Sequence, residues 1–374
     1  MKLELIATTT FGLEAVVKRE IQNLDYKIKS VEDGKITFWG DERAIVKSNL
    51  WLRSADRVLV KMAEFQAFEF EELFQQTKAI PWEEWIPING EFIVNGTSVK
   101  SKLHSVPACQ SIVKKAIVDR LMEFYATDAL TEDGALYTIK VTILKDRVTL
   151  TVDTSGRGLH KRGYRVKDTA APMKETLAAG LVQLSFFKEG RTMVDTCAGS
   201  GTIPIEAAMI VNNVAPGLNR DFISEEWDII SPQLWEEERM LARKAIKKAE
   251  DTKIYAIDID QRAIEAGVEN AKAAGVYDSI LFKQMDMTNL KTKAENGIFI
   301  TNPPYGERIG DKKQIDKIYA KFNEFLQEHP TWSLFMITTD KEVESKVLNR
   351  EADRRRKLYN GRLETCYYQF HGEK

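Results

Sequence analysis

The tetrapeptide Asn302-Pro303-Pro304-Tyr305 is the part of the sequence best suited to positioning a reactive amine. Each proline holds the residue before it in an extended conformation, so the turn is rigid. We expect the Asn302 side-chain oxygen and the Pro303 carbonyl to point at one place, where they can accept both hydrogens of an exocyclic NH₂ group. The nitrogen lone pair then faces an electrophile, and Tyr305 offers a ring for a base to stack on. This pattern predicts catalysis by positioning, without a covalent enzyme intermediate.

A second stretch, Val194–Ala208, has the pattern of a strand, a glycine turn and a helix. Glycines permit a tight turn and a close approach of the main chain to a bulky ligand, and the start of the helix supplies free N–H groups. An ordinary strand-to-helix turn has the same pattern, because G-x-G alone is a weak signal. The cofactor contacts that we expect from this turn are Asp195, Cys197, Ala198, Gly199, Gly201 and Thr202.

Polar residues also follow the strands that we predict further along the chain. Asp258 ends the strand predicted at 253–257 and is placed to accept the two hydroxyls of a ribose. Asp286 follows the next strand and can accept from an adenine amino group. With Asp195 and Asn302, these residues lie at the carboxyl ends of strands, where ligands bind in open α/β sheets. Ile259, Met287 and Asn302 complete the expected cofactor contacts.

Two basic segments are the candidates for nucleic-acid binding. Between 98 and 120, five Lys and Arg residues face one Asp, and between 156 and 174 six face one Asp. Basic residues interleaved with His160 and Tyr164 could contact phosphates and stack on a base. A solvated helix face and a plain linker are the respective alternatives. The expected RNA contacts are Lys100, Lys102, Lys114, Lys115, Arg157, His160, Lys161, Arg162, Tyr164 and Arg165.

Bulk composition narrows the functional class. The chain has 374 residues, a formal net charge of −2 and three cysteines without a C-x-x-C pair. These values predict more than one domain, no disulfide framework and no zinc site. The scattered histidines form no metal motif, so we expect no bound metal. Without a signal peptide or a long apolar run, the sequence favours a cytoplasmic protein.

The pattern of elements predicts an α+β unit at 1–60, a second at 61–155 and a doubly wound α/β domain at 156–374. A linker is expected at about 156–170 and a largely helical insertion at about 215–248. Because this boundary carries glycines and little periodicity, we expect removal of 1–155 to leave a folded, cofactor-binding domain that has lost RNA.

At these motifs the C-terminal half resembles class I S-adenosylmethionine (SAM) dependent methyltransferases with an N-P-P-Y motif, which methylate exocyclic amino groups. The phrases G-L-H-K-R-G-Y-R, D-T-C-A-G-S-G-T-I-P-I-E-A-A and A-P-G-L-N-R resemble a narrower group, the THUMP-containing bacterial guanine-N2 methyltransferases of 23S ribosomal RNA. The resemblance covers nearly the whole chain. Thr196 departs from it, because many relatives have proline there, and some relatives carry a second methyltransferase domain for which this chain is too short.

The resemblance implies a Rossmann-like, seven-stranded methyltransferase domain behind a ferredoxin-like unit and a THUMP RNA-binding domain. It implies SAM as cofactor, held by Asp195, Gly199, Gly201 and Asp258, with Asp286 at the adenine. It places the target amine at 302–305 and makes RNA, most of all 23S rRNA, the partner.

Other functions fit part of the pattern. A tRNA guanine-N2 methyltransferase would have the same domains, and a non-catalytic RNA-binding or ribosome-assembly factor would need neither the glycine turn nor Asn302. An adenine-N6 DNA methyltransferase suits N-P-P-Y but not the N-terminal half, which has no DNA-reading helix motif. Cys197 as a nucleophile is disfavoured, because N-P-P-Y occupies the place where 5-methylcytosine enzymes carry their cysteine.

Overall fold

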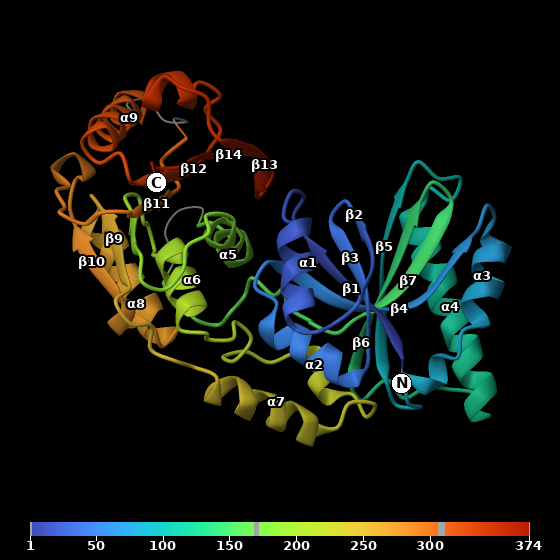
Figure 1. Ribbon diagram of the computed structural model, residues 1–374. Coiled ribbons are helices and arrows are strands. Elements are labelled where there is room, and N and C mark those ends of the chain that lie inside the picture. The colour runs from blue at the N-terminus through green and yellow to red at the C-terminus, as the bar shows by residue number, and fades with distance from the viewer. Residues whose placement is uncertain (1, 168–171, 306–310, 374) are drawn as a thin grey trace.

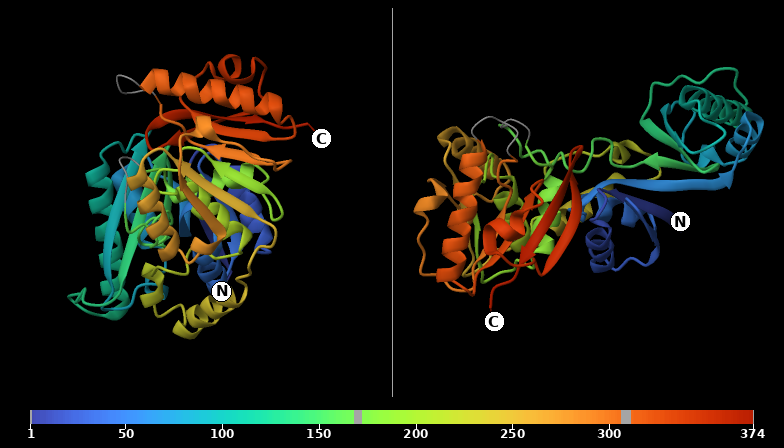
Figure 2. Two further views of the ribbon diagram at one scale, coloured as in Figure 1. Left: turned by 90° about the vertical axis from the view of Figure 1, so that its left-hand side faces the viewer. Right: turned by 90° about the horizontal axis from the view of Figure 1, so that it is seen from above.

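The computed structural model describes residues 2–167, 172–305 and 311–373. They form two lobes, each built around a seven-stranded sheet (Figure 1). Seen from above, the lobes lie end to end and join at the middle of the molecule (Figure 2). The end of the linker expected at about 156–170 lies outside the described residues, and the first helix after it covers Glu175–Leu184.

The N-terminal lobe contains one sheet in the order β2-β3-β1-β4-β7-β6-β5. Its strands are β1 (Leu3–Thr9), β2 (Ile28–Glu32), β3 (Lys35–Gly40), β4 (Ala55–Gln66), β5 (Glu91–Val99), β6 (Leu136–Leu144) and β7 (Arg147–Asp153). Neighbouring strands are antiparallel except β5 and β6, which are parallel. The first half of β4 pairs with β1 and the second half with β7. The two α+β units expected from the sequence therefore share one continuous sheet.

Four helices lie against this sheet: α1 (Glu14–Asn23), α2 (Glu42–Trp51), α3 (Phe70–Lys78) and α4 (Val106–Tyr125). Local sequence explains several boundaries. Asp41 caps α2, because its carboxylate accepts the Ala44 N–H at 2.9 Å. The β6–β7 turn is made by Lys145 and Asp146, both at positive φ, as a tight hairpin turn requires.

The C-terminal lobe contains a sheet in the order β10-β9-β8-β11-β12-β14-β13. Its strands are β8 (Thr192–Asp195), β9 (Lys253–Asp258), β10 (Ile280–Gln284), β11 (Ile298–Thr301), β12 (Ser333–Thr338), β13 (Arg354–Asn360) and β14 (Leu363–Phe370). Strands β8 to β12 are parallel, and β14 is antiparallel to its neighbours β12 and β13. Every residue of β11 and β12 is buried, which explains their nearly continuous apolar sequences. This is the expected doubly wound α/β sheet.

Helices cover both faces of this second sheet: α5 (Glu175–Leu184), α6 (Thr202–Val211), α8 (Gln261–Ala273) and α9 (Asp311–Glu328). One core cluster joins α5, α6 and the sheet, and another gathers around Phe299, Phe322 and Phe325 under α9. Shorter helical turns lie at Trp82–Glu84, Ile223–Glu226, Tyr277–Ser279, Met287–Asn289 and Glu344–Leu348. Together, the strands and helices of this lobe position one edge of the second sheet, the edge at which its parallel strands end.

The insertion joins the two lobes. Its helix α7 (Pro232–Lys244) packs on α2, and Arg43 of α2 forms ion pairs with Glu237 and Glu238 of α7. The Trp227 ring stacks on Tyr137 with 4.8 Å between centroids, and its Nε1 donates to the Leu136 carbonyl at 3.0 Å. Trp227 and Trp235 thus belong to the core of the N-terminal lobe. The expectation that 156–374 folds without 1–155 is at odds with this shared core.

Candidate active site and nucleic-acid surface

Four predicted site residues gather at the carboxyl edge of the second sheet. Asp195 ends β8 and Asp258 ends the neighbouring β9. Asn302 follows β11, the other neighbour of β8, and Asp286 comes two residues after β10. Because these strands are adjacent and parallel, residues far apart in the sequence come together along one edge of the sheet.

The glycine turn between β8 and α6 has the conformation that its residue types predict. Gly199 and Gly201 have φ of +53° and +81°, the left-handed region that glycine adopts freely. A Cβ at Gly201 would lie 3.3 Å from the Gly267 Cα, so this glycine also permits close packing against α8. The Gly201 N–H donates to the Ala198 carbonyl at 2.8 Å, and the Ala198 N–H to the Ile257 carbonyl at 2.9 Å. The turn is thereby fastened to the end of β9.

Asp258 is held by main-chain donors. One carboxylate oxygen accepts the Gly199 N–H at 2.8 Å, and the other accepts the Asp260 N–H at 3.0 Å. Each oxygen retains a second lone pair for a ligand hydroxyl. Ile259 beside it is 54% exposed, an unusual position for a large apolar residue and suitable for covering a ligand's flat ring. These features, beside the glycine turn, fit a nucleoside-bearing cofactor.

The next two predicted cofactor contacts, Asp286 and Met287, differ in their exposure to solvent. Asp286 is exposed, and its Oδ1 accepts both the N–H and the hydroxyl of Thr288 at 2.9 Å, which caps the short turn after it. Met287 is buried in the core cluster under α9.

Asp195 is almost completely buried, and burial raises its pKa to about 7. The neighbouring Asp258 charge acts in the same direction, while the Cys197 N–H and the Thr301 hydroxyl favour the ionised form. A carboxyl with this pKa is partly protonated at neutral pH in the unliganded protein. A positively charged ligand nearby would favour its ionised form.

Cys197 does not have the environment of a nucleophile. Burial, together with the charges of Asp195 and Asp258, raises the pKa of its thiol. A reactive cysteine needs a lowered thiol pKa and positive neighbours, so this thiol stays protonated. Beside it, the hydroxyls of Thr196 and Thr301 lie 3.2 Å apart and join the ends of β8 and β11. Thr196 thus makes a polar contact between strands that a proline could not.

The tetrapeptide begins with a buried acceptor that has no partner. Among the described residues, none hydrogen-bonds to the Asn302 Oδ1, although that atom is shielded from solvent. A buried acceptor without a donor lowers the stability of a protein by about 1–3 kcal/mol. We expect such an acceptor where the donor is a substrate. Pro303 is buried and Pro304 exposed. The Tyr305 hydroxyl accepts the Asn360 side-chain amide at 3.1 Å, so the end of β13 supports the motif. Residues 306–310 lie outside the described part.

Two predicted RNA contacts are wrong. Arg162 and Tyr164 are 3% and 2% exposed. The Arg162 Nε lies 3.4 Å from Glu206 of α6, its Nη1 donates to the Leu159 carbonyl at 2.7 Å, and its Nη2 donates to the Arg53 carbonyl. The Tyr164 hydroxyl donates to the same Glu206 at 3.1 Å. Arg162 thereby links the two lobes, and neither side chain reaches the surface, because a buried carboxylate needs these partners.

Arg165 faces the glycine turn instead of the surface. Its Nη1 donates to the Ser200 hydroxyl and its Nη2 to the Thr202 hydroxyl, both at 3.1 Å, while its Nε donates to Glu175 at 2.8 Å. The guanidinium therefore bridges the inter-lobe segment, α5 and the first turn of α6. We assign Arg165 a positioning role at the glycine turn.

The rest of the predicted RNA set is accessible. Arg157, Lys161, Lys100, Lys102 and Lys115 are exposed, and Lys114 is half-buried. The Lys102 ammonium lies 4.9 Å from the ring centroid of Phe68, which is itself 39% exposed. His160 is partly buried, and burial with nearby Lys174 and Lys161 lowers its pKa to about 4. His160 is therefore neutral at pH 7 and suits stacking more than phosphate binding.

Sequence reasoning missed two residues that shape this region. Arg220 donates through its guanidinium to the carbonyls of Ser155, Arg157, Gly158 and Lys161. These bonds hold residues 155–161 around the Arg220 side chain. Arg220 also lines a basic cavity with Arg157, Lys161 and Arg165. Asn270 is fully buried, accepts the N–H groups of Val166 and Lys167, and donates to the Ser200 carbonyl at 3.2 Å. Carbonyl contacts of this kind leave no motif in a sequence.

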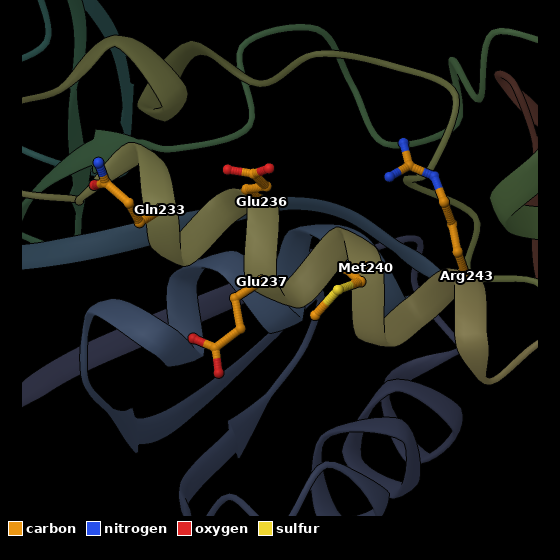
Figure 3. A pocket seen from close by; sticks show the side chains of 5 residues that line it. All are labelled: Gln233, Glu236, Glu237, Met240 and Arg243. Atoms are coloured by element: carbon orange, nitrogen blue, oxygen red, sulfur yellow. The ribbon is translucent and has the colours of Figure 1, made fainter.

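A separate hollow lies on the insertion helix. Figure 3 shows a hollow lined by Gln233, Glu236, Glu237, Met240 and Arg243, all on α7. It brings no nucleophile or acid–base pair together, so we assign it no function. Within residues 2–167, 172–305 and 311–373, no three His, Cys, Asp or Glu side chains gather as a metal site. In the same part of the chain, no helix has both the length and the apolarity to cross a membrane.

Comparison with known proteins shows which families the parts of this chain match. The profile described as "RMKL-like, methyltransferase domain" matches residues 162–369, the "RlmL ferredoxin-like domain" matches 4–59 and the "THUMP domain" matches 67–153. The Bacillus subtilis protein named "Putative RNA methyltransferase YpsC" is 48% identical over 371 residues, which are 99% of this chain and 96% of that protein. The "Ribosomal RNA large subunit methyltransferase K/L" of Syntrophotalea carbinolica is 32% identical over 97% of this chain, and the match spans 52% of that longer protein.

Solved structures agree on the fold. The structure described as "SMU.472, a putative methyltransferase complexed with SAH" has a TM-score of 0.94 and 43% identity, and the match covers 100% of this chain and 99% of that one. A "predicted N6-adenine-specific DNA methylase" from Listeria monocytogenes has a TM-score of 0.95 and 46% identity, with 100% and 97% covered.

Proposed function

The chain belongs to the RMKL-like family of SAM-dependent RNA methyltransferases, and from that premise we propose that it methylates the exocyclic N2 amine of a guanosine in 23S ribosomal RNA. The observation that carries the proposal is the buried Oδ1 of Asn302 at the sheet edge, which has no hydrogen-bond partner among the described residues. An amine hydrogen is the donor that this oxygen lacks, and the Pro303 carbonyl next to it is the second acceptor.

We assign the cofactor to the glycine turn and the ends of β9 and β10. Bound there, it supplies the electrophilic methyl group. Asp258 would accept from its ribose hydroxyls, Ile259 would cover its adenine, and Asp286 would accept from the adenine amino group. The glycine turn, with Gly199 and Gly201 both at positive φ, and the two donors that orient Asp258 support this assignment.

The chain's own residues then act by holding the amine. With both amine hydrogens engaged, the nitrogen lone pair points at the electrophile, which is the positioning that raises rates without covalent catalysis. Tyr305, supported by Asn360, would stack on the base. The proton of the methylated amine leaves after transfer, and Asn302 and Pro303 supply no base for it, so we infer that water accepts it.

The RNA surface that we propose consists of exposed basic residues on both lobes. Lys100, Lys102 and Lys115 lie on the N-terminal lobe, and Arg157 and Lys161 line the basic cavity between the lobes. Their charges suit phosphates, which position an RNA without reading its sequence. The K/L relative's name supports ribosomal RNA as the substrate.

Methyl transfer from labelled SAM tests the proposal. The wild type and Asn302→Ala are compared on 23S rRNA, tRNA and duplex DNA from a strain in which the gene is deleted. We expect label in 23S rRNA only, and loss of it in the variant. Mass mapping of the product then separates N2-methylguanosine from other methylated bases. Label confined to tRNA would favour the tRNA enzyme, label at adenine in DNA would favour the activity named for the Listeria relative, and no transfer would favour a binding factor.

A further inference from the structure

The loop after β1 brings an exposed aromatic ring of the N-terminal lobe to the edge of the catalytic lobe. Phe11 is 44% exposed, and its ring meets Tyr359 of β13 edge to face with 6.3 Å between centroids. The Lys357 ammonium lies 5.5 Å from the Tyr359 ring centroid. Two rings from opposite ends of the sequence thus form one aromatic pair next to a cation.

The main chain at Phe11 is fixed against the catalytic lobe. Arg356 donates through Nη1 to the Gly12 carbonyl at 2.9 Å. Gly12 has φ of +93°, and a Cβ there would lie 2.4 Å from the Lys357 carbonyl oxygen. The Glu14 carboxylate accepts the Gly12 N–H at 2.8 Å. These contacts fix the main chain of Gly12, the residue after Phe11, against the catalytic lobe.

The pair lies beside the proposed amine site. Strand β13 runs in the direction of the parallel strands, because β14 between it and β12 is antiparallel to both. The end of β13 therefore reaches the carboxyl edge of the sheet. Asn360, the residue after Tyr359, is the one that donates to the Tyr305 hydroxyl at 3.1 Å. Tyr359 and Asn360 are successive residues of β13, so the pair is tied to the tetrapeptide through the main chain of this strand, and the two side chains point to opposite faces of the sheet.

We propose that Phe11 and Tyr359 form a stacking platform for the base next to the methylated nucleotide. A guanine amine cannot reach the sheet edge while its base is stacked, so the base must turn out of the RNA. Its neighbour then loses a stacking partner, and an aromatic side chain can replace that partner. The inference rests on the proposed function, because it requires an RNA whose target base leaves the stack.

Three variants of Phe11 separate stacking from simple packing between the lobes. Phe11→Leu keeps apolar volume against Tyr359 but removes the ring, Phe11→Ala removes both, and Phe11→Trp keeps a ring. Each is assayed with labelled SAM and total RNA from the deletion strain. We expect KM for RNA to rise roughly tenfold in both Phe11→Leu and Phe11→Ala, within the range measured for base stacking on aromatic side chains, and to stay within about twofold in Phe11→Trp. SAM affinity and Tm should not change in any of them.

Two results would overturn the platform while the proposed function stands. One is a wild-type KM for RNA in Phe11→Leu, which would make the contact a packing contact. The other is a wild-type KM in Phe11→Ala. Tyr359→Leu repeats the test from the catalytic lobe and should give the same rise as Phe11→Leu. If the wild type transfers no methyl group to any RNA, the proposed function fails and the platform with it.

Discussion

The Arg165 guanidinium donates to the Ser200 hydroxyl at 3.1 Å, so the segment between the lobes that carries Arg165 helps to fix the glycine turn. The same guanidinium reaches Thr202 at the start of α6 and Glu175 at the start of α5. A residue expected to contact RNA therefore supports the cofactor turn, which connects the inter-lobe segment to the proposed chemistry.

Replacing Arg165 should weaken SAM binding. Arg165→Ala removes donors to Ser200 and Thr202 and leaves Glu175 without this partner. Because hydrogen bonds to charged groups contribute about 1.5–3 kcal/mol, we expect Kd for SAM to rise at least about tenfold. Calorimetric titration measures it. Lys167→Ala is the matched control, since the side chain of this exposed lysine pairs with Glu269 on the surface. Equal affinities for wild type and Arg165→Ala would contradict the positioning role.

Asp258→Ala should also weaken SAM binding, for a different reason. The substitution removes the acceptor proposed for two ribose hydroxyls, so a loss of at least tenfold is expected, at about 1.5–3 kcal/mol for each charged hydrogen bond. Asp260→Ala is the control two residues away, because its carboxylate caps α8 by accepting the Arg262 N–H. That variant should bind SAM normally. Unchanged affinity in Asp258→Ala would remove this residue from the cofactor site.

Asn302→Ala should lose turnover while it keeps its SAM affinity. Loss of one preorganised polar partner costs about 10²–10³-fold in rate for oxyanion-hole donors, and we expect a similar loss here. A single-turnover assay at saturating RNA and SAM isolates the chemical step, with calorimetry on the same preparation as the control. A rate within about threefold of wild type, far from that loss, would mean that the tetrapeptide is only a turn.

The affinity for SAM should depend on pH through Asp195. Burial raises its pKa to about 7, so the carboxyl is protonated below that pH and ionised above it in the unliganded protein. SAM carries a sulfonium charge, which favours the ionised form. Its Kd should therefore fall by at most about tenfold per pH unit as pH rises from 5.5 to 7. Above about pH 7 the Kd should level off. Asp195→Asn should flatten the profile in calorimetry at pH 5.5, 6.5, 7.5 and 8.5, and a wild-type slope in that variant would assign the dependence to another group.

The fragment 156–374 should fold poorly. Without 1–155, Trp227 loses Tyr137 and α7 loses α2, which exposes Phe222, Trp227 and Trp235. Burying one large apolar side chain stabilises by about 1.5–3 kcal/mol, against a total of about 5–15 kcal/mol for a domain. We expect no cooperative melt by circular dichroism and no SAM binding by calorimetry. A sharp melt with wild-type SAM affinity would show that the catalytic lobe folds alone.

The sheet edge could be predicted because its pattern is local. Asp195, Asp258 and Asn302 each end an apolar run, and parallel strands bring such ends together whatever lies between them. The positive φ of Gly199 and Gly201 likewise follows from residue type. These features need only short-range information and the rules of α/β sheets.

The roles of the basic segment could not be predicted, because they depend on distant partners. Arg162 and Arg165 are three residues apart and both looked like phosphate contacts. One is buried against Glu206, and the other is turned toward Ser200. The sequence predicts only that the insertion is largely helical, and the structure shows Trp227 in the core of the other lobe. Charge and composition do not report which acidic or aromatic residue a side chain meets in three dimensions.

Strand β4 has a mechanical consequence. Its 12 residues belong to both parts of the N-terminal sheet, and an extended strand of that length spans about 40 Å. Helix α7 braces the same lobe through the ion pairs of Arg43 with Glu237 and Glu238. Under the proposed function, the basic residues around Lys102 and the sheet edge would be held at a set separation, so that the length and bend of the RNA between its bound phosphates and its target base would become part of what is recognised.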